Sequence, residues 1–347
     1  GVITARVMEE AERAGLFYPP DPNSWETCTI GGNVAANAGG PRALKYGVTR
    51  DYVLGLEAVL PGGEVIRTGR RTVKGVAGYD LTALLVGSEG TLAVITEIAL
   101  RLVPLPRHVR TALCIFPDVA AAARAVAAVL GAGILPRTLE LFDDQAIAAA
   151  DTRGPFRFPK EAGAALLAET DGDDAEAVMG ALVRLGEIAG EAGAVDVLVA
   201  RSEAQRRDLW ATRRQISVAL KALFPCKISE DVVVPRSRIP EAIERFKAIG
   251  RDRGLAVATY GHAGDGNLHT NVLYRDEAEA EVVAACIEAL VRATLELGGT
   301  ITGEHGVGLA KRAFLGWEQG EAALALQRRI KAAFDPAGLL NPGKIFP

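Results

Sequence analysis

Residues 109–260 alternate between short apolar runs and longer helical patterns, and this alternation limits the folds that are open to the chain. The apolar runs predict strands at residues 109–116, 138–142, 164–169, 194–200, 232–234 and 255–260. The helical patterns fall at residues 118–131, 174–192, 202–223 and 239–253, with a polar loop expected after residue 142. An order of strand, helix and strand predicts an α+β sheet with its helices on one face.

The first hundred residues have a different pattern, rich in glycine and β-branched residues. Residues 1–16 are predicted to form an amphipathic helix, and because the chain opens inside it without Met we expect a fragment. Strands are predicted at residues 55–60, 64–68 and 91–103. Pro104 and Pro106 bracket a predicted domain boundary. Further on, residues 278–297 predict a long helix, and the last helix is predicted to end at Phe334.

The composition narrows the classes of function. A chain of 347 residues with 49% hydrophobic content is expected to form two domains. A net charge of −4 argues against a nucleic-acid binder, which needs a basic surface. No apolar run approaches the roughly 20 residues that span a bilayer. The four cysteines are scattered without a Cys-x-x-Cys pair, which argues against an iron–sulfur cluster in this chain and favours a reducing, cytoplasmic location.

Three of the four histidines lie in two glycine-rich segments, residues 261–271 and 302–308. The glycines exclude a continuous helix, so a turn between two strands must bring His262 and His269 together. A strand period of two places His269 and Asn271 on one face. Two imidazoles with one carboxylate, that of Glu304, form a ligand set that leaves positions open on zinc or manganese, as a catalytic metal requires.

His305 follows Glu304 directly in the sequence. Adjacent side chains in extended backbone diverge, so His305 can act as a base beside the metal without ligating it, if Glu304 is a ligand. The alternative is that these histidines are surface-loop residues, since Gly, Asp and Asn form turns in many proteins. Three of the four histidines lying beside glycines favours the functional interpretation.

A second candidate element lies on the helix predicted at residues 202–223. Trp210, Arg213 and Ser217 fall at i, i+3 and i+7, along one stripe. Lys227 is expected in the loop that follows. Arg can bind a carboxylate through a bidentate fork, and Lys can bind one as a point charge. The sequence pattern equally supports a solvated charged face made of Arg206, Arg207, Arg213 and Arg214.

Two further glycine-rich segments, residues 29–40 and 86–92, place small residues where a backbone can approach a flat or anionic group. Neither segment is a Rossmann fingerprint or a phosphate-binding Gly-Lys-Ser/Thr loop. Taken alone, tight turns between strands explain both segments equally well.

Eight segments of the chain, taken in order, match one known pattern: residues 19–22, 30–40, 45–47, 78–81, 87–92, 261–271, 302–308 and 340–344. With these segments the chain resembles the vanillyl-alcohol-oxidase-type flavoproteins that carry an FAD-linked oxidase C-terminal domain. The resemblance covers essentially the whole chain. It is nearest to the branch that includes the flavin subunits of bacterial glycolate oxidase and the D-lactate and D-2-hydroxyglutarate dehydrogenases.

The resemblance implies an α+β architecture of three parts. Residues 1–104 would form a partial FAD-binding domain of the PCMH type, without the N-terminal subdomain whose loop wraps the FAD pyrophosphate in family members. Residues 105–300 would form the substrate or cap domain. Residues 301–347 would form the Glu-His catalytic segment and a C-terminal helix that returns to the flavin.

Similar enzymes also imply a role for individual residues. The Gly-His-x-Gly-Asp-Gly-Asn-x-His motif and the Glu-His-Gly motif bind a divalent metal in the family, which implies the ligands His262, His269 and Glu304. His305 matches the catalytic base. The residues implied to bind substrate are Arg213, Ser217, Lys227 and Asn271. The residues implied to bind FAD are Pro20, Asp21, Gly31, Gly32, Asn33, Ala36, Asn37, Gly39, Gly40, Gly47, Gly78, Tyr79, Asp80, Gly87, Ser88, Glu89, Gly90, Leu92, Val94, Ile95 and Asn341.

The implied reaction is FAD-dependent oxidation of a 2-hydroxy acid, of the glycolate or D-lactate type, to the 2-oxo acid. Because the chain has no cluster-binding cysteines, an iron–sulfur or other electron-accepting subunit is the expected partner, through which the enzyme could associate peripherally with the inner membrane. The alternatives are a stand-alone D-lactate or D-2-hydroxyglutarate dehydrogenase, a metal-dependent hydrolase that needs no flavin, and an inactive fragment.

Overall fold

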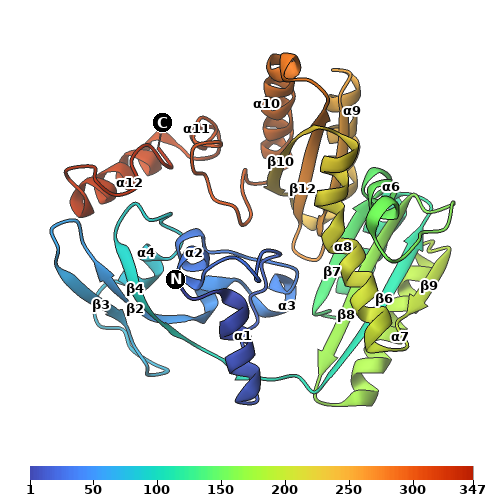
Figure 1. Ribbon diagram of the computed structural model, residues 1–347, viewed down its shortest axis with the longest axis horizontal. Helices are drawn as coiled ribbons and strands as arrows, with labels where there is room; N and C mark the ends of the chain where they lie inside the picture. The colour runs from blue at the N-terminus through green and yellow to red at the C-terminus, as the bar shows by residue number, and fades with distance from the viewer. Residues whose placement is uncertain (347) are drawn as a thin grey trace. The chain divides into compact units, whose positions relative to one another are not determined.

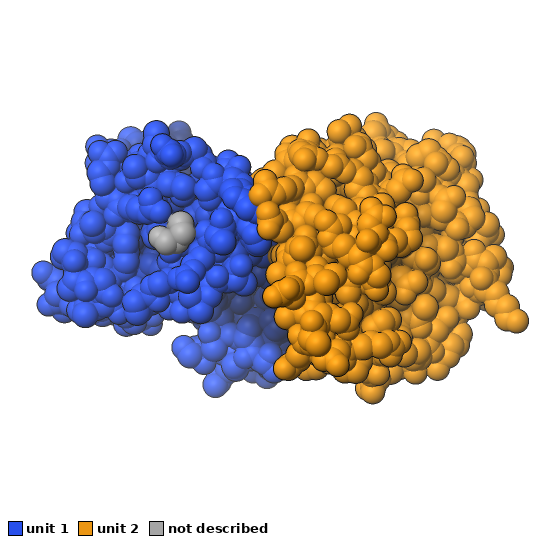
Figure 2. All heavy atoms as spheres, turned by 90° about the horizontal axis from the view of Figure 1, so that it is seen from above, with its two compact units in different colours: residues 1–105, 301–347 blue, residues 106–300 orange. Residues whose placement is uncertain are grey.

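The computed structural model describes residues 1–346 of the chain (Figure 1). The chain divides into two compact units, which Figure 2 shows in separate colours. Unit 1 joins Gly1–Leu105 to the residues from Ile301 onward, and unit 2 is Pro106–Thr300. The division falls between Pro104 and Pro106, where each proline ring removes a backbone donor and the residue before it favours an extended conformation.

Unit 2 is built on a seven-stranded sheet in the order β10-β12-β11-β7-β8-β6-β9, and every neighbouring pair is antiparallel. Its strands are β6 (His108–Phe116), β7 (Thr138–Asp143), β8 (Ala164–Gly172), β9 (Asp196–Val199), β10 (Cys226–Val233), β11 (Ala256–His262) and β12 (Asn267–Tyr274). Its helices are α5 (Val119–Gly131), α6 (Asp144–Arg153), α7 (Ala175–Glu191), α8 (Glu203–Leu223), α9 (Ile239–Arg251) and α10 (Ala280–Glu296), with short 3-10 turns at Arg236–Arg238 and Glu277–Glu279.

Helices cover both faces of this sheet (Figure 1), so the prediction of a single helical layer was wrong. On one face, α6 and α8 contribute Ile147 and Ile216 to a buried cluster that includes Tyr260. On the other face, Thr170 of β8 donates a hydrogen bond to the carbonyl oxygen of Val178 in α7. Because successive residues of a strand point to opposite faces, a sheet covered on both sides has apolar residues at consecutive positions, as β6 does.

Two elements near the candidate site differ from the prediction. The polar loop expected after residue 142 is helix α6, whose N-cap Asp143 accepts a hydrogen bond from the Ala146 N–H. Strand β10 is longer than residues 232–234, and Lys227 lies in this strand, not in a loop. Lys227, Ser229 and Asp231 hid the strand pattern, since their side chains point to the face that carries His269 and Asn271 and not to an apolar core.

Unit 1 contains a three-stranded antiparallel sheet in the order β3-β2-β4. Its elements are α1 (Thr4–Arg13), β1 (Leu16–Phe17), α2 (Ile30–Ala36), α3 (Ala43–Tyr46), a 3-10 turn (Thr49–Tyr52), β2 (Val53–Val59), β3 (Val65–Gly69), α4 (Leu81–Leu85), β4 (Val94–Leu100), β5 (Val103–Pro104), α11 (Leu315–Glu318) and α12 (Glu321–Phe334). Ile330 and Phe334 of α12 pack against the buried cluster that contains Leu56 of β2. The C-terminal helix is therefore part of the core of unit 1.

Residues 30–36 of the glycine-rich segment at residues 29–40 form helix α2, so the alternative of a tight turn between strands does not hold for this segment. Thr29 caps the helix by accepting a hydrogen bond from the Gly32 N–H, and Asn37 ends it in a left-handed conformation. Glycines lower helix propensity, so capping at both ends and burial of Val34 compensate for them here.

Strands β11 and β12 form a hairpin, as predicted for the segment around His262 and His269. His262 pairs with Asn267 across the turn, and Tyr260 pairs with His269. The turn requires glycine at position 266, where φ is +89° and a Cβ would lie 2.1 Å from the carbonyl oxygen of Val234. This turn sets the register that places both histidines on the same face of the sheet.

We predict that Gly266→Ala lowers the thermal unfolding midpoint of the protein, because the added methyl must displace the Val234 carbonyl and because positive φ costs a non-glycine residue about 1–3 kcal/mol. Gly180→Ala in α7 is the matched control, since no atom lies within 4 Å of a Cβ at that position. Calorimetry of both variants measures the difference. Equal midpoints for Gly266→Ala and the wild type would show that the turn does not have this geometry.

Candidate active site

The candidate site occupies one face of the unit 2 sheet, where strand register gathers four side chains. His269 pairs with Tyr260, and His262 pairs with Glu140 of β7. Directly paired residues point to the same face, so all four side chains lie together. The rings of His262 and His269 are 5.2 Å apart and nearly perpendicular, and those of Tyr260 and His269 are 5.7 Å apart. All four side chains are buried.

Glu140 is a fully buried carboxylate that the sequence analysis missed. Its Oε1 lies 2.5 Å from Nδ1 of His262, and its Oε2 accepts a 2.7 Å hydrogen bond from Nε of Arg213. Burial opposes ionisation of Glu140, but its interactions with His262 and Arg213 outweigh burial and hold the pKa of this carboxyl group below its usual range. An ionised acceptor at Nδ1 assigns the proton of a neutral His262 to that nitrogen, which leaves a lone pair on Nε2.

Arg213 is buried, with 5% of its surface exposed, so it does not belong to a solvated charged face. Its guanidinium carbon lies 4.8 Å from the ring centroid of Tyr260, within the range of a cation–π contact. Because Nε is bonded to Glu140, the two terminal nitrogens are the donors that remain for another anion.

Lys227 lies in β10 and is held by Ser217 of α8. Its Nζ donates hydrogen bonds to Oγ of Ser217 at 2.6 Å and to the Ser217 carbonyl oxygen at 3.2 Å. Burial and the nearby charge of Lys221 lower the pKa of Lys227. No carboxylate among residues 1–346 pairs with this ammonium group. A partly buried cation without a counter-charge favours the binding of an anion.

Asn271 is fully buried on β12, two residues after His269. Its Nδ2 donates to the carbonyl oxygens of Ala258 at 3.3 Å and His269 at 3.0 Å. Its Oδ1 is buried without a hydrogen-bond partner in the part of the chain that the structure describes. The amide therefore presents an unused acceptor, which is costly unless a ligand satisfies it.

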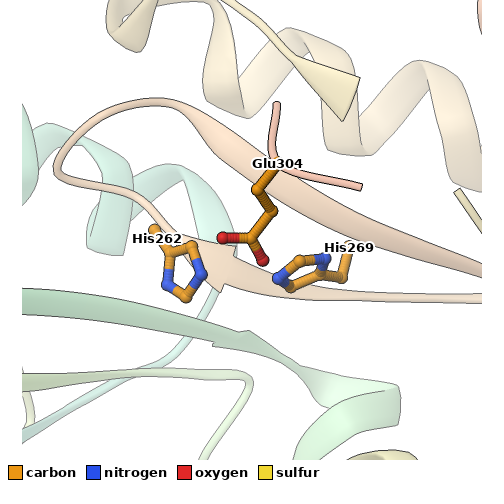
Figure 3. Close-up of side chains that lie close together, drawn as sticks. All are labelled: His262, His269 and Glu304. Atoms are coloured by element: carbon orange, nitrogen blue, oxygen red, sulfur yellow. The ribbon is translucent and has the colours of Figure 1, made fainter. Parts of the chain in front are cut away.

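The side chains of His262, His269 and Glu304 lie close together, and the carboxylate of Glu304 points towards the two imidazole rings (Figure 3). Each residue offers one ligand atom, and these atoms all lie within 4.8 Å of one another. Ligand atoms bound to one zinc ion at roughly 2.0–2.2 Å lie about 3–4 Å apart, so these three residues are candidates to hold an ion. His305 stands beside this group, with its Nε2 3.8 Å from Oε1 of Glu304 and its side chain half exposed.

The turn that follows Glu304 is held by Glu89. The two carboxylate oxygens of Glu89 accept hydrogen bonds from the N–H groups of Val307 at 2.7 Å and Gly308 at 2.8 Å. Next to the same turn, a Cβ at Gly39 would lie 2.9 Å from Oε2 of Glu304. Glu89 and Gly39 were predicted to contact FAD, and the structure also gives them a part in placing the Glu304 segment. No signal in the sequence indicated that part.

The residues predicted to bind FAD all lie in unit 1. Some have structural partners there: Asp21 forms an ion pair with Arg42 at 3.0 Å, and Leu92 lies in the buried core. Others are open to solvent, and Tyr79 is 96% exposed. Contact between these residues and a flavin stays a prediction.

Comparisons with known proteins assign the family. Residues 105–345 match the family described as FAD linked oxidases, C-terminal domain, and residues 1–69 match the family described as FAD binding domain. The chain belongs to the FAD-linked oxidases. It is therefore an oxidoreductase, and the alternative of a flavin-free hydrolase loses its support. The resemblance predicted from the sequence segments is confirmed.

Two curated relatives match this oxidase along its length. Glycolate oxidase subunit GlcD of Bacillus subtilis (strain 168) is 43% identical over 348 residues, which cover 100% of this chain and 74% of the relative. D-lactate dehydrogenase of Anaerostipes hadrus is 38% identical over 356 residues, which cover 99% of this chain and 74% of the relative.

Solved structures share the fold of the oxidase. A p-cresol methylhydroxylase with bound substrate superposes with a TM-score of 0.78 at 16% identity, covering 99% of this chain and 74% of that one. A 4-ethylphenol oxidase from Gulosibacter chungangensis gives 0.73 at 20% identity, covering 100% and 76%. The predicted α+β fold class is confirmed. None of the helices in residues 1–346 is both long and apolar enough to cross a bilayer.

We predict that Glu89→Gln speeds hydrogen–deuterium exchange at the N–H groups of Val307 and Gly308. A neutral amide has only one oxygen to accept these two bonds, and hydrogen bonds to a charged group are worth about 1.5–3 kcal/mol each. Exchange at these positions should therefore rise by about tenfold or more. Glu57→Gln, which changes a carboxylate bonded to Arg67 in the β-sheet of the same unit, is the control. Unchanged exchange in Glu89→Gln would show that Glu89 does not hold the turn at Val307 and Gly308.

Proposed function

We propose that this FAD-linked oxidase oxidises a small 2-hydroxy acid, of the glycolate or D-lactate type, to the corresponding 2-oxo acid. The observation that carries the proposal is one sheet face that combines the His262–His269 pair with two cations, the buried Arg213 and the partly buried Lys227. A 2-hydroxy acid has a carboxylate and a hydroxyl on adjacent carbons, so it needs an anion site beside a group that activates the hydroxyl. The names of the two relatives, a glycolate oxidase subunit and a D-lactate dehydrogenase, support the same substrate class.

In this proposal His262, His269 and Glu304 hold a divalent metal, zinc or manganese. The donor set suits such an ion, because two imidazole nitrogens and one carboxylate leave coordination positions open. The hydrogen bond that Nδ1 of His262 donates to Glu140 also fits, since outer carboxylates commonly orient metal-binding histidines in this way. The ion, when bound, would supply a Lewis acid for the substrate hydroxyl.

Arg213 and Lys227 would bind the substrate carboxylate. Arg213 would use its terminal nitrogens, since Glu140 occupies Nε, and Lys227 would act as a point charge. Ser217 fixes the Lys227 ammonium by accepting two of its hydrogen bonds, so its effect on substrate binding would be indirect. The unused Oδ1 of Asn271 would accept a hydrogen bond from the substrate hydroxyl.

His305 would remove the hydroxyl proton as general base. It lies next to Glu304 but outside the group of three ligand atoms, and its exposed side can pass the proton to water. FAD, when bound, would supply the two-electron acceptor for oxidation of the hydroxyl carbon. The family match at residues 1–69 and 105–345 supports FAD in that role.

The electrons would then pass to a separate acceptor. All four cysteines are free, and none belongs to a Cys-x-x-Cys pair. We therefore propose an iron–sulfur protein or another electron-accepting subunit as the partner. The Bacillus subtilis relative is itself named as a subunit, which supports this choice. A D-lactate dehydrogenase that acts alone on a diffusible acceptor is the alternative, since the second relative carries that name.

Anaerobic mixing of the FAD-loaded enzyme with glycolate, D-lactate and L-lactate tests the reaction. We expect the visible absorbance of the oxidised flavin to disappear with at least one hydroxy acid and to persist with propionate, which has a carboxylate but no hydroxyl. A flavin that stays oxidised with every hydroxy acid would refute the proposed function.

We predict that His269→Ala lowers the zinc affinity of the chain by more than the roughly 10–100-fold loss that removal of an outer partner causes. His305→Ala should leave zinc affinity unchanged, because His305 is a base and not a ligand. His108→Ala, at the start of β6, is the control. Competition with a coloured chelator gives these affinities without any catalytic assay. Loss of zinc in His305→Ala would show that the roles of Glu304 and His305 are wrongly divided.

A further inference from the structure

Five buried side chains of unit 2 form a closed ring of contacts around the candidate site: Glu140, His262, His269, Tyr260 and Arg213. The ring closes through the Glu140–His262 hydrogen bond, the His262–His269 and His269–Tyr260 ring contacts, the stacking of Arg213 on Tyr260, and the Arg213–Glu140 hydrogen bond. Two members of the ring are candidate metal ligands, and a third is the candidate carboxylate-binding residue.

Glu140 is the member that joins these two functions by polar bonds. One oxygen of its carboxyl group accepts from Arg213, and the other lies against His262. The two oxygens belong to one planar group, so they cannot move independently. A rotation of the carboxyl group that follows Arg213 must therefore also move the acceptor that orients the His262 ring.

We propose that Glu140 is a positioning residue that couples Arg213 to His262, so that a change in the substrate-anion half of the site alters the metal half. The inference rests on the proposed function, since it takes His262 as a metal ligand and Arg213 as a carboxylate-binding residue. It adds a physical link between the carboxylate-binding Arg213 and the metal ligand His262, and both residues lie in unit 2.

Stability alone does not account for this arrangement. Burying an ion pair costs desolvation, and well-packed apolar residues of similar volume often give equal or greater stability. The neighbours of Glu140 along β7, Leu139 and Leu141, are buried apolar residues of that kind. A carboxylate in such a strand is better explained by the geometry that it imposes on its two partners.

Glu169 on β8 provides a matched comparison. It is also buried, and it accepts 2.7 Å hydrogen bonds from Nε of Arg206 and from Nε1 of Trp210. Both arginines come from α8, and both carboxylates come from neighbouring strands of the same sheet. Glu169 makes no hydrogen bond to a candidate metal ligand. Changes in the Glu169–Arg206 pair therefore reproduce the loss of an arginine partner from a buried carboxylate without touching the site.

Zinc affinity, measured by competition with a chelator in the absence of substrate, tests the coupling. We expect Glu140→Gln to weaken zinc binding by about 10–100-fold. We expect Arg213→Lys to weaken it several-fold, although Arg213 is no ligand, because a lysine cannot hold the carboxyl group of Glu140 in the same orientation. In a double variant that carries both Glu140→Gln and Arg213→Lys, the second substitution should not weaken zinc binding further, since the Glu140 carboxylate that links Arg213 to His262 is already absent.

Glu169→Gln and Arg206→Lys should leave zinc affinity at the wild-type value. The coupling is wrong if Glu140→Gln binds zinc as the wild type does, or if Arg213→Lys has the same effect with and without Glu140. If Glu140→Gln does not fold, Arg213→Lys compared with Arg206→Lys decides, and equal zinc affinities would overturn the coupling. A wild-type chain that binds no zinc would refute the metal site of the proposed function, whereas a zinc-binding wild type with unaffected variants would refute the coupling alone.

Discussion

The antiparallel register of β7, β11 and β12 is the constraint on which the candidate site depends. It sets His269 beside Tyr260 and His262 beside Glu140, all on one face of the sheet. A slip of one residue would turn every one of these side chains to the opposite face. That face is occupied by α7 and α9, whose apolar residues could not accept charged groups. Packing on both sides of the sheet thus protects the register that creates the site.

Helix α8 completes the site by presenting a polar stripe to the same face. Arg206, Trp210 and Arg213 recur every three or four residues, and each finds a buried carboxylate on the sheet. Ser217, one turn further, holds Lys227. The helix therefore lies over the sheet with Arg206 and Arg213 facing inward, and Glu169 and Glu140 balance the charges of these two arginines. Lys227 remains without a carboxylate partner among the described residues. An anion bound beside Lys227, at the end of the stripe, would therefore supply the counter-charge that this ammonium group lacks.

Much of the fold followed from local patterns, while the network of the site did not. Strands β6 and β7 and helix α8 lie within one residue of their predicted positions, because the hydrophobic period is a local signal. The hairpin that carries His262 and His269 was predicted from its glycines, and it is confirmed. Glu140 escaped notice because its partner His262 is 122 residues away in the sequence. A lone acid between Leu139 and Leu141 was the available signal, and pattern alone cannot tell which distant group such an acid meets.

The most direct test of the account is X-ray absorption spectroscopy at the zinc edge on the zinc-loaded protein. The arrangement of His262, His269 and Glu304 predicts imidazole nitrogen and carboxylate oxygen ligands at about 2.0–2.2 Å, with the outer-ring scattering that two histidines produce. A sulfur ligand at about 2.3 Å, which only a cysteine could supply at that distance, would contradict this site. So would a spectrum of water ligands without imidazole scattering.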